Sequence, residues 1–298
     1  MALELTSIEC RRLGLSPKDF LTGTDDSQTG GNLRGIEIGN RGRNYFGGNS
    51  PVYITGGIDG HFDDFHGAVI NTNLWDVNKG TDGSAANFAV LLAQPFGVVR
   101  GTTGANASAD MAGNGVQLCG GLNFLLSNGD AEMEAMLKPA AITTSNLFVG
   151  WHDTTAHTLQ APFTISAGVV TANAANAVGF VFDTSATAAT VKFCSVNASG
   201  TPAIIDTGVA PSTTAFQRWR VSVDVAGNAS GFIAGSQVTP IVGSQVYNIA
   251  LAIATTSQMG PKVQYFRRAA TATNIDVDYL FGQQRMVTAV GSTAGTTR

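Results

Sequence analysis

Apolar and polar residues alternate in short segments through most of the chain, from about residue 59 to about residue 286. In residues 131–137, Met133, Ala135 and Leu137 fall on one face of a strand, and polar or flexible residues fall on the other. A period of two predicts a half-buried β-strand. Further segments of this kind lie at 147–151, 177–182, 190–196, 217–225, 229–233, 249–254 and 274–281.

Turn sequences separate these segments, because glycine and asparagine supply the backbone angles that tight turns require. They lie at 127–130, 197–200, 226–228 and 257–261. No helical periodicity longer than two turns occurs between residues 59 and 286. Short strands at this spacing predict an all-β sandwich.

Residues 1–58 have a different pattern, with glycine-rich joints and few apolar runs. After a short helix expected at 7–13, small polar residues alternate with single apolar anchors: Leu33, Ile36, Ile38, Tyr45 and Phe46. This pattern predicts an extended N-terminal arm that lies along another protein surface, with a disordered leader as the alternative. We therefore expect an arm at 1–58, a β-sandwich at 59–286 and a flexible C-terminal tail at 287–298.

The composition supports a polar, weakly charged surface. Of 298 residues, 44% are hydrophobic and only 13% are charged, about half the usual charged share. The net charge is −4 and no basic stretch exceeds two residues, so we expect no nucleic-acid partner. No secretory signal and no apolar run of about 18 residues is present, so we expect synthesis in the cytosol and no membrane partner.

Several segments resemble, in the order in which they occur, a group of concanavalin A-like jelly-roll proteins of tailed phages and prophages. They are FDDFHGAVINTNLWDVNKGTDG, EMEAMLKPAAITTSNLFVGWHDTTAHTLQAP, AANAVGFVFDTSATAATVKFCSVNASG, TAFQRWRVSVDVAGNASGFIAGSQV and NIDVDYLFGQQR, which together span about three quarters of the chain. The resemblance implies a jelly-roll β-sandwich whose first and last strands pair side by side. This fold hosts lectins, hydrolases and inert structural modules, so it indicates function only weakly.

Glu132 and Glu134 are the best candidates for catalysis. The glucanase branch of the fold carries its catalytic acids on one strand, as Glu, apolar, Asp, one or two apolar residues, and Glu. A retaining mechanism needs two carboxyls about 5 Å apart, and these two glutamates share a strand face at a repeat of roughly 7 Å. Met136 stands where the third acid would be. We therefore expect solvated glutamates on an outward face and no catalytic residue.

His152, Asp153 and His157 could in principle ligate zinc or iron. We instead expect the end of a buried strand running into a loop, where Asp and Thr serve turn chemistry. The expectation is that the protein holds no metal and no cofactor. The three cysteines lie far apart without zinc-type spacing and are expected to be free thiols, two of them buried: Cys10, Cys119 and Cys194.

For the other acidic and aromatic residues we also expect structural rather than catalytic or ligand-binding roles. Asp63 and Asp64, between His61 and His66, are expected to bond backbone amides at the sandwich edge. Acids that could be drawn into a lectin-type calcium site are expected to be solvated: Asp82, Asp183, Asp206, Asp276 and Asp278. The tryptophans are expected in the core rather than on a sugar-binding platform: Trp75, Trp151 and Trp219.

Taken together, these features predict a non-enzymatic virion protein, synthesised in the host bacterial cytoplasm and localised to the capsid surface or tail. The first hypothesis is a capsid decoration or cement protein. Its arm anchors would bind the major capsid protein or other virion proteins, and the sandwich would form a trimer. The alternative is a tail-fibre or tail-spike module that binds a host glycan. A degenerate glycan hydrolase is the third possibility.

Overall fold

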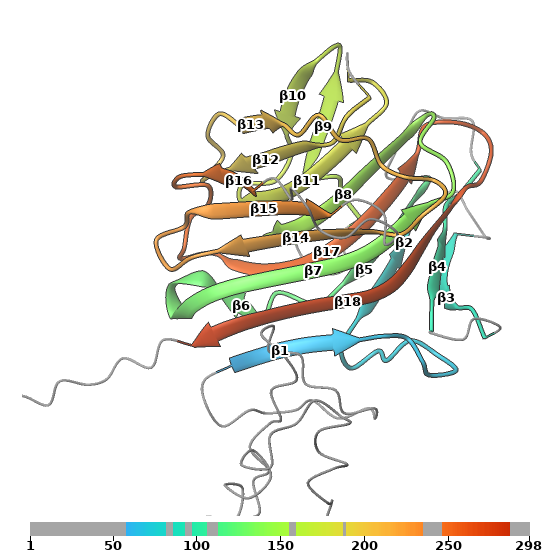
Figure 1. Cartoon of the computed structure of the whole chain (residues 1–298), viewed down its shortest axis with the longest axis horizontal. Coiled ribbons are helices and arrows are strands. Elements are labelled where there is room, and N and C mark those ends of the chain that lie inside the picture. The colour runs from blue at the N-terminus through green and yellow to red at the C-terminus, as the bar shows by residue number, and fades with distance from the viewer. Residues whose placement is uncertain are drawn as a thin grey trace, which may run out of the picture. The chain divides into compact units, whose positions relative to one another are not determined.

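The computed structural model describes residues 58–81, 86–92, 97–105, 113–154, 159–186, 189–234 and 246–286. In these ranges two large sheets pack face to face, and the only helical element is the short 3-10 turn η2 (Leu126–Asn128). Neighbouring strands in these sheets run antiparallel (Figure 1). This confirms the expected all-β sandwich.

Each large sheet has eight strands. The front sheet has the order β16 (Val246–Ile249), β15 (Ala229–Ala234), β14 (Gln217–Val223), β7 (Gly129–Pro139), β18 (Asn274–Met286), β4 (Val99–Thr102) and β3 (Asn87–Val90), with β1 (Ile58–Asp63) beside β18. The back sheet has the order β13 (Ala203–Asp206), β12 (Lys192–Val196), β11 (Ala177–Asp183), β8 (Ser145–His152), β17 (Gln258–Arg267), β5 (Gly115–Cys119) and β2 (Asp76–Lys79), with β6 (Phe124–Leu125) beside β17. The pairing of β1 with β18 agrees with the implied pairing of first and last strands.

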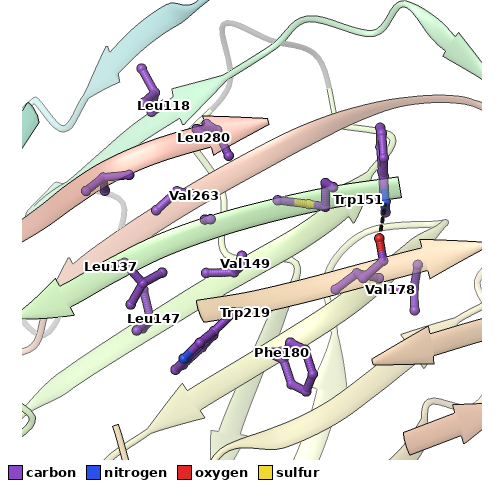
Figure 2. Close-up of a cluster of buried hydrophobic side chains, with 14 of the residues drawn as sticks. Leu118, Leu137, Leu147, Val149, Trp151, Val178, Phe180, Trp219, Val263 and Leu280 are labelled. Carbon is purple, nitrogen blue, oxygen red and sulfur yellow. Dashed lines mark hydrogen bonds between the residues drawn. The ribbon is translucent and has the colours of Figure 1, made fainter. Parts of the chain in front are cut away.

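The core between the sheets contains all three tryptophans, each with an exposed fraction of 0%. Trp151 of β8 donates its indole Nε1–H to the carbonyl oxygen of Val221 of β14, at 3.4 Å. This bond is the dashed line at Trp151 in Figure 2. This bond joins the back sheet to the front sheet across the apolar layer. The prediction that the tryptophans are core residues is confirmed.

A two-stranded hairpin, β9 (Phe163–Ser166) and β10 (Val169–Ala172), carries a second apolar cluster with the outer side of the back sheet. Phe163 and Ile165 of the hairpin belong to this cluster with Phe148 of β8. Both sides of β8 are consequently buried along its whole length. This explains why its sequence is a nearly continuous apolar run rather than a strict alternation.

Two predicted boundaries are wrong. Residues 250–254, expected as a strand, form a turn after β16, where Leu251 has a left-handed φ of 48°. Residues 257–261, expected as a turn, lie mostly inside β17. Pro261 fits there because it packs beside two glycines: a Cβ on Gly120 or on Gly282 would lie 2.8 Å from the Pro261 ring.

Some expectations fall outside the described residues. These include the short helix at 7–13, Cys10, the arm anchors Leu33, Ile36, Ile38, Tyr45 and Phe46, and the tail. The division into arm, sandwich and tail therefore stays a prediction. Cys119 and Cys194 are buried free thiols, as expected. In the described part of the chain, no helix is long and apolar enough to span a membrane.

Replacing Leu147 with alanine should lower the free energy of unfolding by about 2–5 kcal/mol, because Leu147 is fully buried between the sheets and its removal leaves a cavity. Urea denaturation measures this change. Val169→Ala is the control, since Val169 is 66% exposed on the hairpin and its loss should change the free energy by less than about 0.5 kcal/mol. Equal effects of the two substitutions would contradict the placement of the core.

Candidate functional site

The outer face of the front sheet carries the candidate catalytic glutamates. Along β7, one set of alternate residues is buried in the main core: Ala131, Met133, Ala135 and Leu137. The residues between them project from the opposite face: Glu132, Glu134, Met136 and Lys138. We call this outer surface of the front sheet the front face. The predicted division of the two faces of this strand is confirmed.

Glu134 is not solvated, contrary to expectation, because its exposed fraction is only 4%. The hydroxyl of Tyr279 donates a hydrogen bond to its Oε1 atom, and Arg218 Nε lies 3.8 Å from Oε2. In the sheet register Arg218 and Tyr279 lie on either side of Met136, which is two residues from Glu134 and on the same face of β7. Neighbouring strands therefore neutralise a carboxylate that would otherwise be costly to bury.

A row of large side chains crosses the sheet at the level of Glu134. In the sheet register Arg220 of β14 and Phe281 of β18 lie on either side of Glu134. Phe232 of β15 lies opposite Arg220. The guanidinium groups of Arg218 and Arg220 lie 5.2 and 5.5 Å from the centre of the Phe232 ring. The aromatic rings and the charged groups of this row therefore hold one another in place.

The next row, at the level of Glu132, is polar throughout. Glu132 lies between Ser222 and Gln283 in the register, and Ser230 lies opposite Ser222. The side chain of Glu132 is 31% exposed, and its Oε1 atom lies 3.3 Å from Nη1 of Arg220. This glutamate is accessible at the surface, as expected, although it is also ion-paired.

This polar row forms part of an open hollow of about 430 Å³. Small-molecule sites have volumes of about 300–1,000 Å³. The lining residues come from β7, β14, β15, β18 and the loop between β14 and β15: Asp130, Ala131, Glu132, Ser222, Val223, Asp224, Asn228, Ser230 and Gln283. The hollow thus brings together carboxylates, side-chain amides and hydroxyls from segments far apart in the sequence.

The β14–β15 turn at one side of the hollow is held by its own side chains. Asp224 Oδ1 accepts hydrogen bonds from the backbone N–H groups of Ala226 and Asn228, both at 2.9 Å. Asp224 Oδ2 accepts one from Asn228 Nδ2, also at 2.9 Å. Burial by itself raises the pKa of Asp224, but these hydrogen bonds outweigh burial and lower it. These hydrogen bonds therefore fix the conformation of the turn at one side of the hollow.

Asp276 and Asp278 of β18 were expected to be solvated, and the structure instead buries Asp276 and partly buries Asp278. β18 lies inside the sheet, between β7 and β4. Asp276 is buried, accepts two hydrogen bonds from Arg100 at 2.7 and 3.0 Å, and lies 3.6 Å from Lys138. The register shifts between Val277 and Tyr279, so Asp278 sits at a bulge.

Asp278 lies near Asp64, the residue that follows β1. Burial, and then repulsion from Asp64, raise the pKa of Asp278. Asp63 accepts the backbone N–H of Phe65 at 2.7 Å, which confirms its expected amide-bonding role. Asp64 instead lies 3.5 Å from Nε2 of His66. No group of three or more His, Cys, Asp or Glu residues in the described ranges is arranged to hold a metal ion.

The candidate metal ligand His152 is fully buried on the outer side of the back sheet, at the end of β8. Its Nδ1 atom accepts the backbone N–H of Thr154 at 3.2 Å and lies 3.4 Å from Nζ of Lys262. Burial, and then the charge of Lys262, hold the pKa of His152 well below its usual range. His152 is therefore a neutral packing residue under the loop that follows β8, and His157 lies outside the described residues.

Two further acids take part in ion pairs. Asp183 is fully buried, not solvated, and binds Arg268 at 2.6 Å and Asn146 at 2.9 Å. Asp206 is exposed, as expected, and is paired with Lys192. Asp82 and the side chain of His61 lie outside the described residues.

Sequence reasoning missed the partners of the two glutamates: Arg218, Arg220, Ser222, Tyr279 and Gln283. A signal was present for the first three, which alternate with the buried Trp219, Val221 and Val223 along β14. Nothing in the sequence assigns β14 and β18 as the two neighbours of β7. That pairing decides which side chains reach the glutamates.

No protein-family model and no curated protein matches the chain. Solved structures with a similar fold include peanut lectin, which has 10% sequence identity and a TM-score of 0.50 over 78% of this chain and 99% of that chain. A family 16 endo-glucanase from Bacteroides ovatus has 10% identity and a TM-score of 0.49 over 74% and 98% of the two chains. An alginate lyase of polysaccharide lyase family 7 has 9% identity and a TM-score of 0.44 over 72% and 96%.

These similarities identify the sandwich as a concanavalin A-like jelly roll, as the sequence resemblance implied. They contain nothing specific to phages. They also overturn the expectation that the protein is not an enzyme, because glucanases and a polysaccharide lyase are found among its fold neighbours. At these identities the similarity shows the fold alone, so it assigns neither a reaction nor a catalytic residue.

Tyr279→Phe should lower the free energy of unfolding by about 1.5–3 kcal/mol, the usual range for a hydrogen bond to a charged group. In a Glu134→Gln background the same substitution should cost less, about 0.5–1.5 kcal/mol, because the lost bond is then neutral. Chemical denaturation of the two single variants and the double variant measures this coupling. Strictly additive effects would show that Tyr279 does not stabilise the Glu134 carboxylate.

Burial lowers the pKa of Lys262 to about 8 from its ordinary value of 10.5. The unfolded chain therefore binds this proton more tightly, and the resulting destabilisation is complete below pH 8 and fades as the pH rises toward 10.5. We expect Lys262→Met to be more stable than the wild type at pH 7, with the difference shrinking by up to about 1.4 kcal/mol per pH unit above pH 8.

The comparison with this variant removes the contribution of Cys194, whose raised pKa destabilises both proteins alike at alkaline pH. The charge of Lys262 lowers the pKa of Cys119, so the contribution of Cys119 changes with the substitution and is part of the measured difference. Urea midpoints at pH 7, 8 and 9 provide the measurement. A stability difference that does not depend on pH would show that Lys262 keeps an ordinary pKa.

Proposed function

We propose that the protein binds a carbohydrate through the front face, as a lectin-like module. The observation that carries this proposal is the polar hollow, in which carboxylate, amide and hydroxyl side chains from four strands and a turn converge. A sugar presents several hydroxyls, each able to donate and accept a hydrogen bond. Carboxylates accept, side-chain amides and serine hydroxyls do both, and the combination therefore matches a hydroxylated ligand.

The front face is preorganised for such a ligand. Glu132 is fixed by Arg220, and Glu134 by Tyr279 and Arg218. The turn beside the hollow is locked by the hydrogen bonds of Asp224. Polar groups that are already ordered lose little conformational entropy when a ligand binds, which favours affinity. Sites on sheet strands also hold their geometry better than sites on loops.

The fold provides supporting context. Peanut lectin shares the jelly roll, and one fold can host both binding and catalysis. The proposal for this chain rests on its own hollow rather than on that similarity. It concerns binding, and cleavage of the bound chain can be measured separately on the same samples.

Gln283→Ala combined with Ser222→Ala should weaken glycan binding by about 10-fold or more, because each lost hydrogen bond contributes about 0.5–1.5 kcal/mol. Titration calorimetry against a panel of neutral oligosaccharides measures the affinity, and reducing-end release from the same samples measures cleavage. Thr171→Ala, on the exposed strand β10 of the hairpin, is the matched control and should bind as the wild type does. A wild type that binds no glycan, or a double variant that binds as well as the wild type, would contradict the proposal.

The location of this module in a virion is a separate proposal that rests on the sequence. The resemblance to phage proteins and the anchor pattern of residues 1–58 support binding to the major capsid protein or to other virion proteins, with a trimeric sandwich on the capsid surface or tail. A glycan-binding front face is compatible with a tail-fibre or tail-spike module and with a decorated head. Copy number per particle separates these alternatives, since decoration proteins occur in hundreds of copies and fibre modules in a few dozen or fewer, as order-of-magnitude expectations for lattice and tail assemblies.

Deleting residues 1–58 should leave a soluble, cooperatively folding β-protein, because a domain of more than 200 residues buries enough surface to fold alone. The truncated protein should fail to bind its particle, since the arm would supply most of the interface. Circular dichroism melts and co-sedimentation with purified particles measure the two effects. Substituting Leu33, Ile36, Ile38, Tyr45 and Phe46 with serine in the full chain is the matched variant. Normal attachment of the truncated protein would refute the arm hypothesis.

A further inference from the structure

An exposed leucine with a strained backbone is hydrogen-bonded to a residue that lines the hollow. Leu251 has a φ of 48°, in the left-handed region, and is 68% exposed. Among the non-glycine residues with positive φ in the described chain, it alone is also a large exposed hydrophobic residue. Such a conformation is costly for a residue with a side chain and persists only where the surroundings impose it.

Two asparagine side chains impose it. Asn228 Oδ1 accepts the backbone N–H of Leu251, and Asn197 Nδ2 donates to its carbonyl oxygen, both at 3.0 Å. Asn228 also lines the hollow and bonds Asp224. The strained residue is thus joined directly to the wall of the hollow, although glycine at this position would satisfy the same backbone bonds without strain.

A second exposed aliphatic residue is also hydrogen-bonded to a residue that lines the hollow. Val225, in the β14–β15 turn, is 43% exposed, and its backbone N–H donates to Oδ1 of Asp130 at 3.1 Å. Asp130 is itself a lining residue. Leu251 and Val225 are thus each hydrogen-bonded through the backbone to a residue that lines the hollow, and we call these two residues the aliphatic rim. A sugar ring likewise has polar edges and an apolar C–H face.

The lining of the hollow also restricts the charge of a ligand. Among the described residues, it includes the carboxylates of Asp130, Glu132 and Asp224 but no lysine or arginine. Arg220 neutralises Glu132 from the neighbouring row, whereas Asp224 accepts hydrogen bonds from N–H groups of its own turn and is not paired with a cation in the described structure. A sugar carboxylate or sulfate entering the hollow would meet like charges at close range, which is unfavourable.

Building on the proposed carbohydrate function, we propose that the hollow and its aliphatic rim form a subsite for one uncharged sugar residue, with Leu251 contacting the apolar face of that sugar. The side chains of the hollow bind the sugar hydroxyls. The acidic lining excludes uronic acids and sulfated sugars. In this account the strain at Leu251 is retained for binding and not for stability.

The test compares stability with affinity. Leu251→Gly should raise the melting temperature, because glycine adopts positive φ without strain, and should weaken binding of the best neutral oligosaccharide by about 5–10-fold, the effect of losing one apolar contact. Ala167→Gly is the matched control, since Ala167 has the same φ of 48° in the turn between β9 and β10. This control should gain stability and keep full affinity.

The charge of the ligand is tested with that oligosaccharide and its derivative in which one CH2OH group is oxidised to a carboxylate. The derivative should bind at least about 10-fold more weakly at low salt, and Asp130→Asn should narrow this gap, as should high salt through screening. Unchanged affinity of Leu251→Gly, or equal or tighter binding of the anionic derivative, overturns the subsite while leaving carbohydrate binding intact. A wild type that binds no ligand of either kind overturns the proposed function and the subsite together.

Discussion

The structure depends on the register in which β7 pairs with β14 and β18. Because side chains alternate across a strand, this register decides at once which residues enter the core and which project from the front face. With Ala135 between Trp219 and Leu280 in the core, Glu134 must lie between Arg220 and Phe281 outside it. A slip by one residue would bury both glutamates among apolar side chains, so the packing of the core enforces the geometry of the face.

The front face also shows how charge is accommodated on a tightly packed sheet. Glu134 is almost completely covered, yet the Tyr279 hydroxyl and Arg218 supply the hydrogen bond and charge that it would lose to water. Arg100 likewise donates two hydrogen bonds to Asp276 and compensates its charge. Glu132, which remains partly exposed, adjoins the hollow. The two most deeply covered carboxylates of this face, Glu134 and Asp276, thus each lie close to a cation, while Glu132 remains accessible to solvent.

Local patterns in the sequence predicted the architecture where side-chain alternation and burial agree, as in β7 and β14. These predictions failed where tertiary contacts determine the backbone conformation. Residues 250–254 leave the sheet because two asparagines hold Leu251 in a turn, and Pro261 stays within a strand because glycines make room for its ring. The two glutamates were found from their spacing, but their burial and partners depend on strands about 80 to 150 residues away.

The hollow could not have been inferred from the sequence for the same reason. Its residues belong to three separate stretches of the chain, and each stretch alone contains ordinary strand and turn residues. Three of the five aspartates considered for a calcium site, Asp183, Asp206 and Asp276, instead form separate ion pairs. Composition alone therefore does not locate a binding site in this fold, whereas the pairing of strands does.

A crystal structure of the protein with a bound neutral oligosaccharide tests the central claim most directly. The account predicts ordered sugar density on the front face, with one ring in the hollow between Gln283 and the β14–β15 turn. Its hydroxyls should lie within hydrogen-bonding distance of the lining side chains. Density confined to the back sheet, to the β9–β10 hairpin or to the opposite end of the sandwich would contradict the assignment of the front face as the carbohydrate site.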